Sequence, residues 1–136
     1  MDAETIAFAH RMFDLARSGD AGELAAQLAH GLPVNLTNDK GDTLLILAAY
    51  HNHAAAVTVL LAHDADTGRV NDRGQTALAA AVFRKNTATV TALLAAGANP
   101  DGGNPSARET AAYFNLPDMT ALLDRPAPVP PQPPGQ

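Results

Sequence analysis

NDKGDTLLILAAYHNHAAAVTVLLAHDAD, at residues 38–66, recurs as NDRGQTALAAAVFRKNTATVTALLAAGAN at residues 71–99. The two stretches align at a constant offset of 33 residues without a gap. The residues that coincide are Asn38 with Asn71, Asp39 with Asp72, Gly41 with Gly74, Thr43 with Thr76, Leu45 with Leu78, Ala48 with Ala81, Val57 with Val90, and Leu60-Leu61 with Leu93-Leu94. A period of this length is typical of solenoids, in which similar units stack on one another.

Each stretch predicts a turn followed by two short helices. Residues 38–42 form the first turn, in which Gly41 is free to adopt a positive φ. Thr43 and, one unit later, Thr76 are placed to cap the helix that follows the turn. The helices expected on this pattern cover residues 44–51, 54–63, 77–84 and 87–96.

The same register extends toward the N-terminus. Residues 3–17 predict an amphipathic helix, and residues 21–30 predict a second helix with leucines on its inner side. The expected inward stripe of the first helix is Ile6, Ala9, Phe13 and Ala16. Because this unit lacks the leading turn, residues 4–35 are interpreted as an N-terminal capping unit, followed by repeats at residues 38–70 and 71–103.

After Pro100 the register shortens by three residues. Ser106 and Glu109 form a capping-box pattern that predicts a helix starting there, and a short last helix is expected to end at Leu123. Residues 104–124 are therefore interpreted as a C-terminal capping unit that completes a domain over residues 1–124.

This pattern of a Gly-x-Thr turn, a short helix and a helix that closes on two leucines resembles the ankyrin repeat. The resemblance covers residues 4–124 and implies an all-α solenoid of about four helix-turn-helix units with short finger turns. It also implies a non-catalytic domain that binds another protein. The chain departs from the family where Lys85 stands at a position usual for glycine, because a left-handed lysine costs roughly 1 kcal/mol.

Composition narrows the possible partners and compartments. The net charge of -5 argues against a nucleic acid or an anionic membrane as the main partner, and the absence of cysteine excludes disulfides and cysteine-based sites. The acidic N-terminus does not fit a signal peptide, and no apolar run approaches a membrane span, so a cytoplasmic protein is expected. Abundant alanine with only two lysines favours a GC-rich bacterial source.

No pattern in the sequence predicts catalysis, a cofactor or a metal site. None of the five histidines has a histidine partner at the spacing that places two ligands on one helix face, and His51 and His53 lie only two residues apart. Surface or helix-end positions explain these histidines more simply. An enzymatic or small-ligand function would need a deep polar pocket and remains the less favoured alternative.

The resemblance implies partner binding through the finger tips and through the concave face of the stack. The finger-tip positions are Asp39, Lys40, Asp42, Asp72, Arg73 and Gln75, and the concave-face positions are Tyr50, His51, Phe83, Arg84, Tyr113 and Phe114. Tyr50, Phe83 and Tyr113 share one repeat position, so their rings are expected to form a ladder along the concave face. The alternatives are solvated turns for the tips and packing between repeats for the rings.

The function that this sequence favours is a monomeric module that binds one partner protein, whose identity stays open. A dedicated accessory or chaperone-like role for a single client is the alternative within the same class. The last segment, RPAPVPPQPPGQ at residues 125–136, carries six prolines and is expected to be disordered. Its Arg125-x-x-Pro128-x-x-Pro131 spacing also fits ligands that bind as polyproline helices, which leaves a ligand role open.

Overall fold

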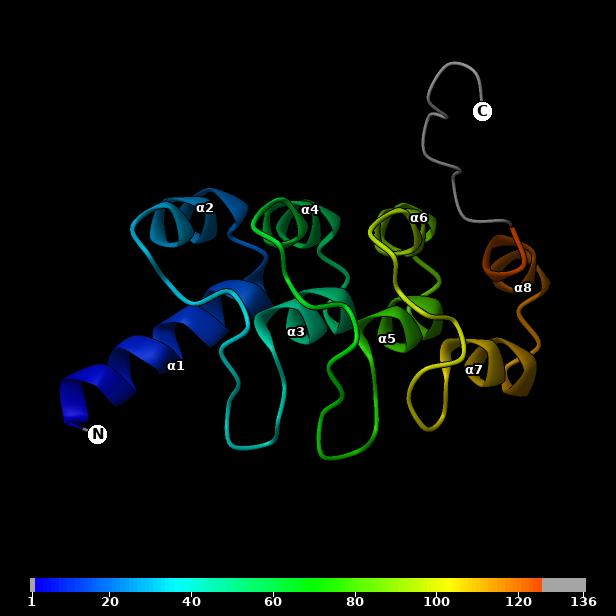
Figure 1. The fold of residues 1–136 in the computed structure, drawn as a ribbon, viewed down its shortest axis with the longest axis horizontal. Helices are drawn as coiled ribbons and strands as arrows, with labels where there is room; N and C mark the ends of the chain where they lie inside the picture. The colour runs from blue at the N-terminus through cyan, green and yellow to red at the C-terminus, as the bar shows by residue number, and fades with distance from the viewer. Residues whose placement is uncertain (1, 126–136) are drawn as a thin grey trace, which may run out of the picture.

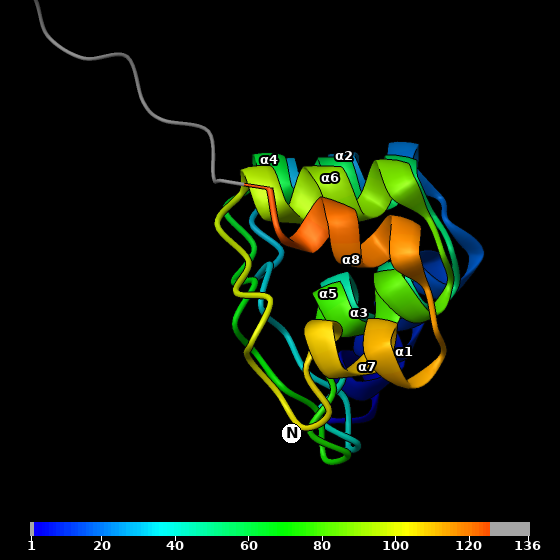
Figure 2. The ribbon, with the colours of Figure 1, turned by 90° about the vertical axis from the view of Figure 1, so that its right-hand side faces the viewer.

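The computed structural model describes residues 2–125, which fold into two layers of short helices stacked side by side (Figure 1). One layer contains α1 (Ala3–Ser18), α3 (Leu44–Tyr50), α5 (Ala77–Phe83) and α7 (Ala107–Tyr113). The other contains α2 (Ala21–Ala29), α4 (Ala54–Ala62), α6 (Thr87–Ala95) and α8 (Pro117–Leu123). Viewed along the stack, the two layers lie one above the other, and the finger turns extend past the α3, α5 and α7 layer (Figure 2). The predicted all-α solenoid of helix-turn-helix units is confirmed.

Side-chain caps start the helices where the sequence predicted. The Thr43 hydroxyl accepts a hydrogen bond from the Ile46 amide at 3.1 Å, and the Thr76 hydroxyl accepts one from the Ala79 amide at 3.1 Å. Ser106 and Glu109 form the complete capping box at the start of α7. Each cap satisfies a backbone donor that the first helical turn leaves without a partner.

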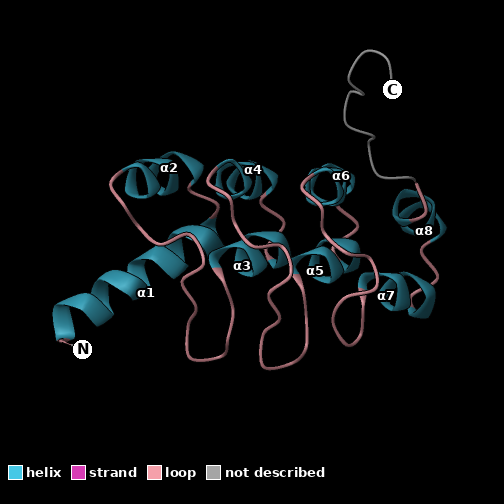
Figure 3. Ribbon diagram, viewed as in Figure 1, coloured by secondary structure: helices cyan, strands magenta, loops and turns pink. Residues whose placement is uncertain are grey.

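In the two repeats, the first helix of each pair ends one residue earlier than predicted. The residues that follow it form a turn that leads into the second helix. Gly19, Asn52, Lys85 and Asn115 occupy this turn with φ values of 78°, 70°, 58° and 53°. Lys85 is therefore left-handed, as the register predicted. Loops join helices throughout the described residues, and the longest loops all extend from one side of the stack (Figure 3).

Alanines let the helices of one layer approach closely. Ala48, Ala49, Ala80 and Ala81 are fully buried, and Leu60 and Leu93 fill the space between the two layers without exposure to solvent. The expectation that Ile6 faces the core is wrong, since its side chain is 42% exposed. The N-terminal turns of α1 run past the end of the stack, where none of the described helices covers them (Figure 1).

Hydrogen bonds also join successive units at the turns between paired helices. The His53 Nε2–H donates to the Arg17 carbonyl at 2.7 Å, and the Asn86 side-chain amide donates to the Asn52 side-chain oxygen at 2.6 Å. His53 is thus a helix-end residue with a structural contact. Within residues 2–125, no helix combines the length and apolar character that crossing a membrane requires.

Candidate functional site

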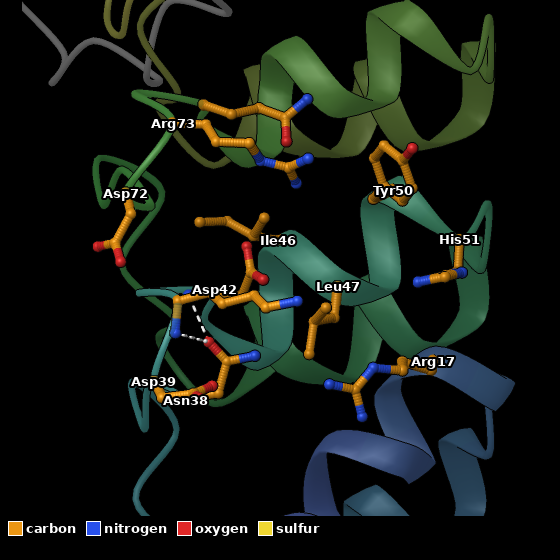
Figure 4. Close-up of a pocket in the computed structure, with 12 residues that line it drawn as sticks. Arg17, Asn38, Asp39, Asp42, Ile46, Leu47, Tyr50, His51, Asp72 and Arg73 are labelled. Carbon is orange, nitrogen blue, oxygen red and sulfur yellow. Dashed lines mark hydrogen bonds between the residues drawn. The ribbon is translucent and has the colours of Figure 1, made fainter.

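The finger turns are built twice by the same side-chain contacts. The Asn38 side-chain oxygen accepts hydrogen bonds from the amides of Lys40 at 3.0 Å and Asp42 at 2.9 Å (Figure 4). One unit later, the Asn71 side-chain oxygen accepts from the amides two and four residues ahead, both at 3.0 Å. An asparagine that binds the backbone ahead of it fixes a tight turn. The residues at both finger tips are therefore held in defined positions.

Neighbouring fingers contact each other directly. The Asp72 amide donates to the Lys40 carbonyl at 2.9 Å, and a Cβ added at Gly41 would lie 2.9 Å from the Asp72 carboxylate. Gly41 also has a φ of +76°. Both the contact and the backbone conformation therefore require glycine at this point.

Asp42 is not an exposed finger-tip residue, in contrast to the prediction. Its side chain is only 6% exposed, and its carboxylate accepts a hydrogen bond at 2.8 Å from the Asn71 side-chain amide, which is 5% exposed. Asp39, Lys40 and Asp72 are exposed as expected. Asp42 instead joins one finger to the next, a contact between residues 29 positions apart.

A cavity of about 690 Å³ lies between the finger turns and the helices α1 and α3. Its lining residues are Arg17, Asn38, Asp39, Lys40, Asp42, Ile46, Leu47, Tyr50, His51, Asp72, Arg73 and Gln75. The side chains of Ile46 and Leu47 lie between Arg17 and Arg73, which approach the cavity from opposite sides (Figure 4). The cavity therefore combines an apolar floor with walls that carry both cationic and acidic side chains.

His51 at the rim of this cavity favours its neutral form. Partial burial lowers the pKa of His51, and the positive potential from His53, Arg17 and Arg84 lowers the pKa further, while Asp42 opposes the shift. A neutral imidazole can both donate and accept a hydrogen bond. His51 can therefore contact polar groups of either kind on a bound molecule.

A second cavity of about 300 Å³ continues the first along the stack. It is lined by Tyr50, Arg73, Gln75, Ala79, Phe83, Pro105, Thr110 and Phe114. Tyr50, Arg73 and Gln75 belong to both cavities. The two cavities thus form one groove, called the groove below, between the fingers and the layer of α1, α3, α5 and α7.

An aromatic ladder of Tyr50, Phe83 and Phe114 runs along this groove. The Tyr50 and Phe83 rings stack with centroids 6.3 Å apart and an interplanar angle of 19°, and Phe83 and Phe114 lie 5.4 Å apart. Phe83 is 40% exposed and Phe114 is 52% exposed. The ladder therefore presents apolar ring surface to solvent along three successive units.

The prediction that Tyr113 supplies the third ring is wrong. Tyr113 is 83% exposed and meets only the edge of Phe114, with centroids 4.9 Å apart. Phe114 follows the last residue of α7, at the position that the polar residues His51 and Arg84 occupy in the preceding repeats. Because Phe114 is apolar, its ring packs against one part of the Phe83 ring and removes that part from water.

Several lining residues were missed by sequence reasoning. Arg17 precedes Tyr50 by one 33-residue period, so the register could have found it. Ile46, Leu47 and Pro105 gave no such signal. Arg84 is exposed and lines neither cavity. In the part of the chain that the structure describes, no three histidine, aspartate or glutamate side chains are grouped so that they could hold a metal ion.

Comparisons with known proteins agree with this architecture. A family model described as ankyrin repeats in three copies matches residues 12–104. An ankyrin repeat protein of Pseudomonas aeruginosa is 54% identical over 57 residues, which cover 42% of this chain and 33% of that protein. The crystal structure of the human ASB11 ankyrin repeat domain matches with a TM-score of 0.74 and 25% identity, over 82% of this chain and 52% of that one.

The match therefore spans about a third of the bacterial relative and about half of the human domain. The repeated register, the stacked helix pairs and the family model agree on one assignment. The chain belongs to the ankyrin-repeat family, whose repeats are generally non-catalytic modules that bind other proteins.

Proposed function

We propose that this chain binds a partner protein along the groove, with the aromatic ladder as the main anchor. The observation that carries this proposal is the exposure of Phe83 and Phe114 in a groove that also holds cationic finger residues. Aromatic and arginine side chains in such settings supply most of the binding energy of protein interfaces. Each anchor is worth about 2 kcal/mol or more when truncated to alanine.

The finger residues give the groove its polar contacts. Among residues 2–125, neither Lys40 nor Arg73 takes part in an ion pair, whereas Arg17 pairs with Asp14 at 2.8 Å. Lys40 and Arg73 can therefore bind carboxylates or carbonyls of a partner without first breaking an ion pair within the chain. Asp39, Asp72 and Gln75 add polar groups around them, and His51 contributes at the rim.

The proposal covers the rest of the chain as well. Residues 1–124 act as one binding domain, with capping units at residues 4–35 and 104–124, and the chain works as a cytoplasmic monomer without a cofactor or turnover. The net charge of -5 supports a protein rather than a nucleic acid or anionic membrane as the partner. The buried carboxylate of Asp42 is already occupied by Asn71, which supports a structural rather than a catalytic role.

Affinity capture from cells of the source organism with matched variants tests this proposal. The partner should be retained by the native chain and by Arg69→Ala, and lost by Arg73→Ala. Arg69 is the matched control because it lies on the same loop, pairs with Asp66 at 3.2 Å and lines neither cavity. Equal capture by both arginine variants would contradict binding through the groove.

The number of captured proteins separates the general module from the dedicated accessory protein. A single client, retained at a constant ratio and stabilised by the chain, would favour the accessory role. Several unrelated partners that all require Arg73 would favour a general binding module.

A further inference from the structure

We propose that the aromatic ladder is also a docking site for a proline-rich segment, and that its occupant is the chain's own residues 126–136. These residues lie outside the described part of the structure, and the notable feature of their sequence is the prolines at positions 126, 128, 130, 131, 133 and 134. This inference does not depend on an external partner, since site and ligand belong to one chain.

The ladder has the chemistry that binds polyproline helices. Grooves that read such helices are lined by aromatic rings, against which the proline rings pack. Here the lining includes Tyr50, Phe83 and Phe114, with Pro105 also at the wall. The ring centroids are separated by 6.3 and 5.4 Å, so the two steps of the ladder extend at most a little beyond one turn of a polyproline helix, about 9 Å.

The spacing of the prolines fits this length. Prolines three residues apart lie on the same side of a polyproline helix, one turn from each other. The segment offers this spacing three times, as Pro128 with Pro131, Pro130 with Pro133, and Pro131 with Pro134. Several registers can therefore place two proline rings against the ladder.

The hydrogen-bonding groups of the proline-rich segment and of the groove are also complementary. Proline has no amide donor, and a polyproline helix forms no internal hydrogen bonds, so such a segment presents carbonyl oxygens that need donors. The groove offers donors on Arg73, Gln75 and the Tyr50 hydroxyl. Residues 126–136 carry no charged side chain, so their docking buries none.

The segment is long enough to reach the ladder. The end of α8 lies on the same side of the stack as the start of α7 but one layer away, and Asp124 binds the Arg108 guanidinium across the two layers (Figure 2). From there to Phe114 the chain must cross from one helix layer to the other, about 10 Å, and travel about the length of α7, roughly 10 Å for its seven residues. Residues 126–136 extended as a polyproline helix cover about 34 Å, enough to pass Phe114 and reach Phe83.

Because the tail is covalently linked to the domain, its effective concentration at the ladder is high even if the contact itself is weak. Docking of the tail and binding of a partner at the ladder would therefore compete. The apparent affinity for a partner is lowered in proportion to the fraction of molecules whose ladder is covered.

A spin label on the tail tests this inference in the full chain. The chain has no cysteine, so Gln132→Cys provides a unique attachment point. In the spin-labelled chain, the amide NMR signals of Tyr50, Phe83 and Phe114 should lose most of their intensity. Signals of α2, on the other layer, should keep theirs.

Two variants make the test specific. Phe114→Ala should restore the signals near Phe83, whereas Phe8→Ala should leave the broadening unchanged, since Phe8 lies on α1 against Arg11 and lines neither cavity. A helical circular dichroism spectrum and an unchanged melting curve verify that each variant is folded. Broadening confined to the residues next to Arg125 would overturn the proposal.

Mixing a spin-labelled chain with an isotope-labelled chain that lacks the spin label examines contacts between copies. If the signals in that mixture broaden as much as in the chain that carries both labels, the contact is between copies, and the intramolecular contact would also be overturned. If the tail does not dock but a captured partner still requires Arg73, only this inference fails. If the tail docks but no partner requires the groove, the proposed function fails and this inference stands.

Discussion

Replacing Asn71 with alanine should destabilise the solenoid much more than the same replacement of Asn38. Both asparagines accept two backbone hydrogen bonds in equivalent finger turns. Only Asn71 also donates to a carboxylate of the neighbouring finger, at 2.8 Å, with both side chains at least 94% buried. The Asn71 side-chain amide also donates to the Gln75 side-chain oxygen, at the longer distance of 3.4 Å. The difference between the two variants therefore reflects mainly the contact between Asn71 and Asp42, which a double-mutant cycle isolates.

The magnitude follows from these contacts. Two neutral hydrogen bonds contribute about 2 kcal/mol together, and a hydrogen bond to a charged group contributes about 1.5–3 kcal/mol more. We expect Asn38→Ala to lower the free energy of unfolding by about 2 kcal/mol, and Asn71→Ala by about 4 kcal/mol. Because Asn71→Ala removes a contact between two neighbouring units, it should also reduce the cooperativity of unfolding.

Urea denaturation followed by circular dichroism measures both effects. A double-mutant cycle with Asp42→Ala and Asn71→Ala should give a coupling energy of about 2 kcal/mol. Equal destabilisation by Asn38→Ala and Asn71→Ala, with a coupling near zero, would refute the reasoning. In that case the fingers would be held together by the backbone contact between Asp72 and Lys40 alone.

Four further substitutions and one deletion test other parts of the structure in the same urea assay. Lys85→Gly should stabilise the protein by up to about 1 kcal/mol, because its φ of +58° is strained for lysine, while Asn115→Gly should change stability little. Thr89→Val should stabilise by about 1 kcal/mol because it removes a buried hydroxyl without a hydrogen-bond partner. Thr110→Val should destabilise by a similar amount, roughly 1 kcal/mol, since that hydroxyl donates to the Ser106 carbonyl at 2.8 Å. Deletion of residues 1–30 should cause aggregation or loss of the cooperative transition, because it uncovers the apolar side of the second unit; a soluble, cooperatively folding product would contradict the capping role.

Much of the fold could be predicted because the helix boundaries are encoded locally. Thr43, Thr76 and Ser106 cap helices through contacts with residues three positions ahead, and such short-range patterns are visible in sequence. The left-handed Lys85 was predictable from its register alone. The period of 33 residues then required that the units stack, since an isolated unit cannot bury its apolar side.

The details of the groove depend on contacts between units, which the sequence does not display. Asp42 resembles its exposed neighbours in the finger, and only the sideways approach of the next finger shows that Asn71 covers it. Likewise, Tyr113 and Phe114 are adjacent aromatics, and the three-dimensional position of Phe83 determines which ring packs against it. Ile6 does lie on the apolar stripe of α1, but its side chain is exposed because the stack of helices ends before it.

The most direct measurement of the central claim is a partner titration and a urea melt on Phe83→Ala, with Tyr113→Ala as the control. Phe83 lies in the middle of the ladder and lines the groove, whereas Tyr113 is 83% exposed and lines neither cavity. Binding through the ladder predicts that Phe83→Ala weakens the captured partner's affinity by about 30-fold or more, corresponding to about 2 kcal/mol. Its cost in folding free energy should stay below about 3 kcal/mol, because the ring is already partly exposed. Unchanged affinity among folded molecules, with a stability loss of about 3–5 kcal/mol, would instead show that Phe83 is a packing residue and contradict the claim.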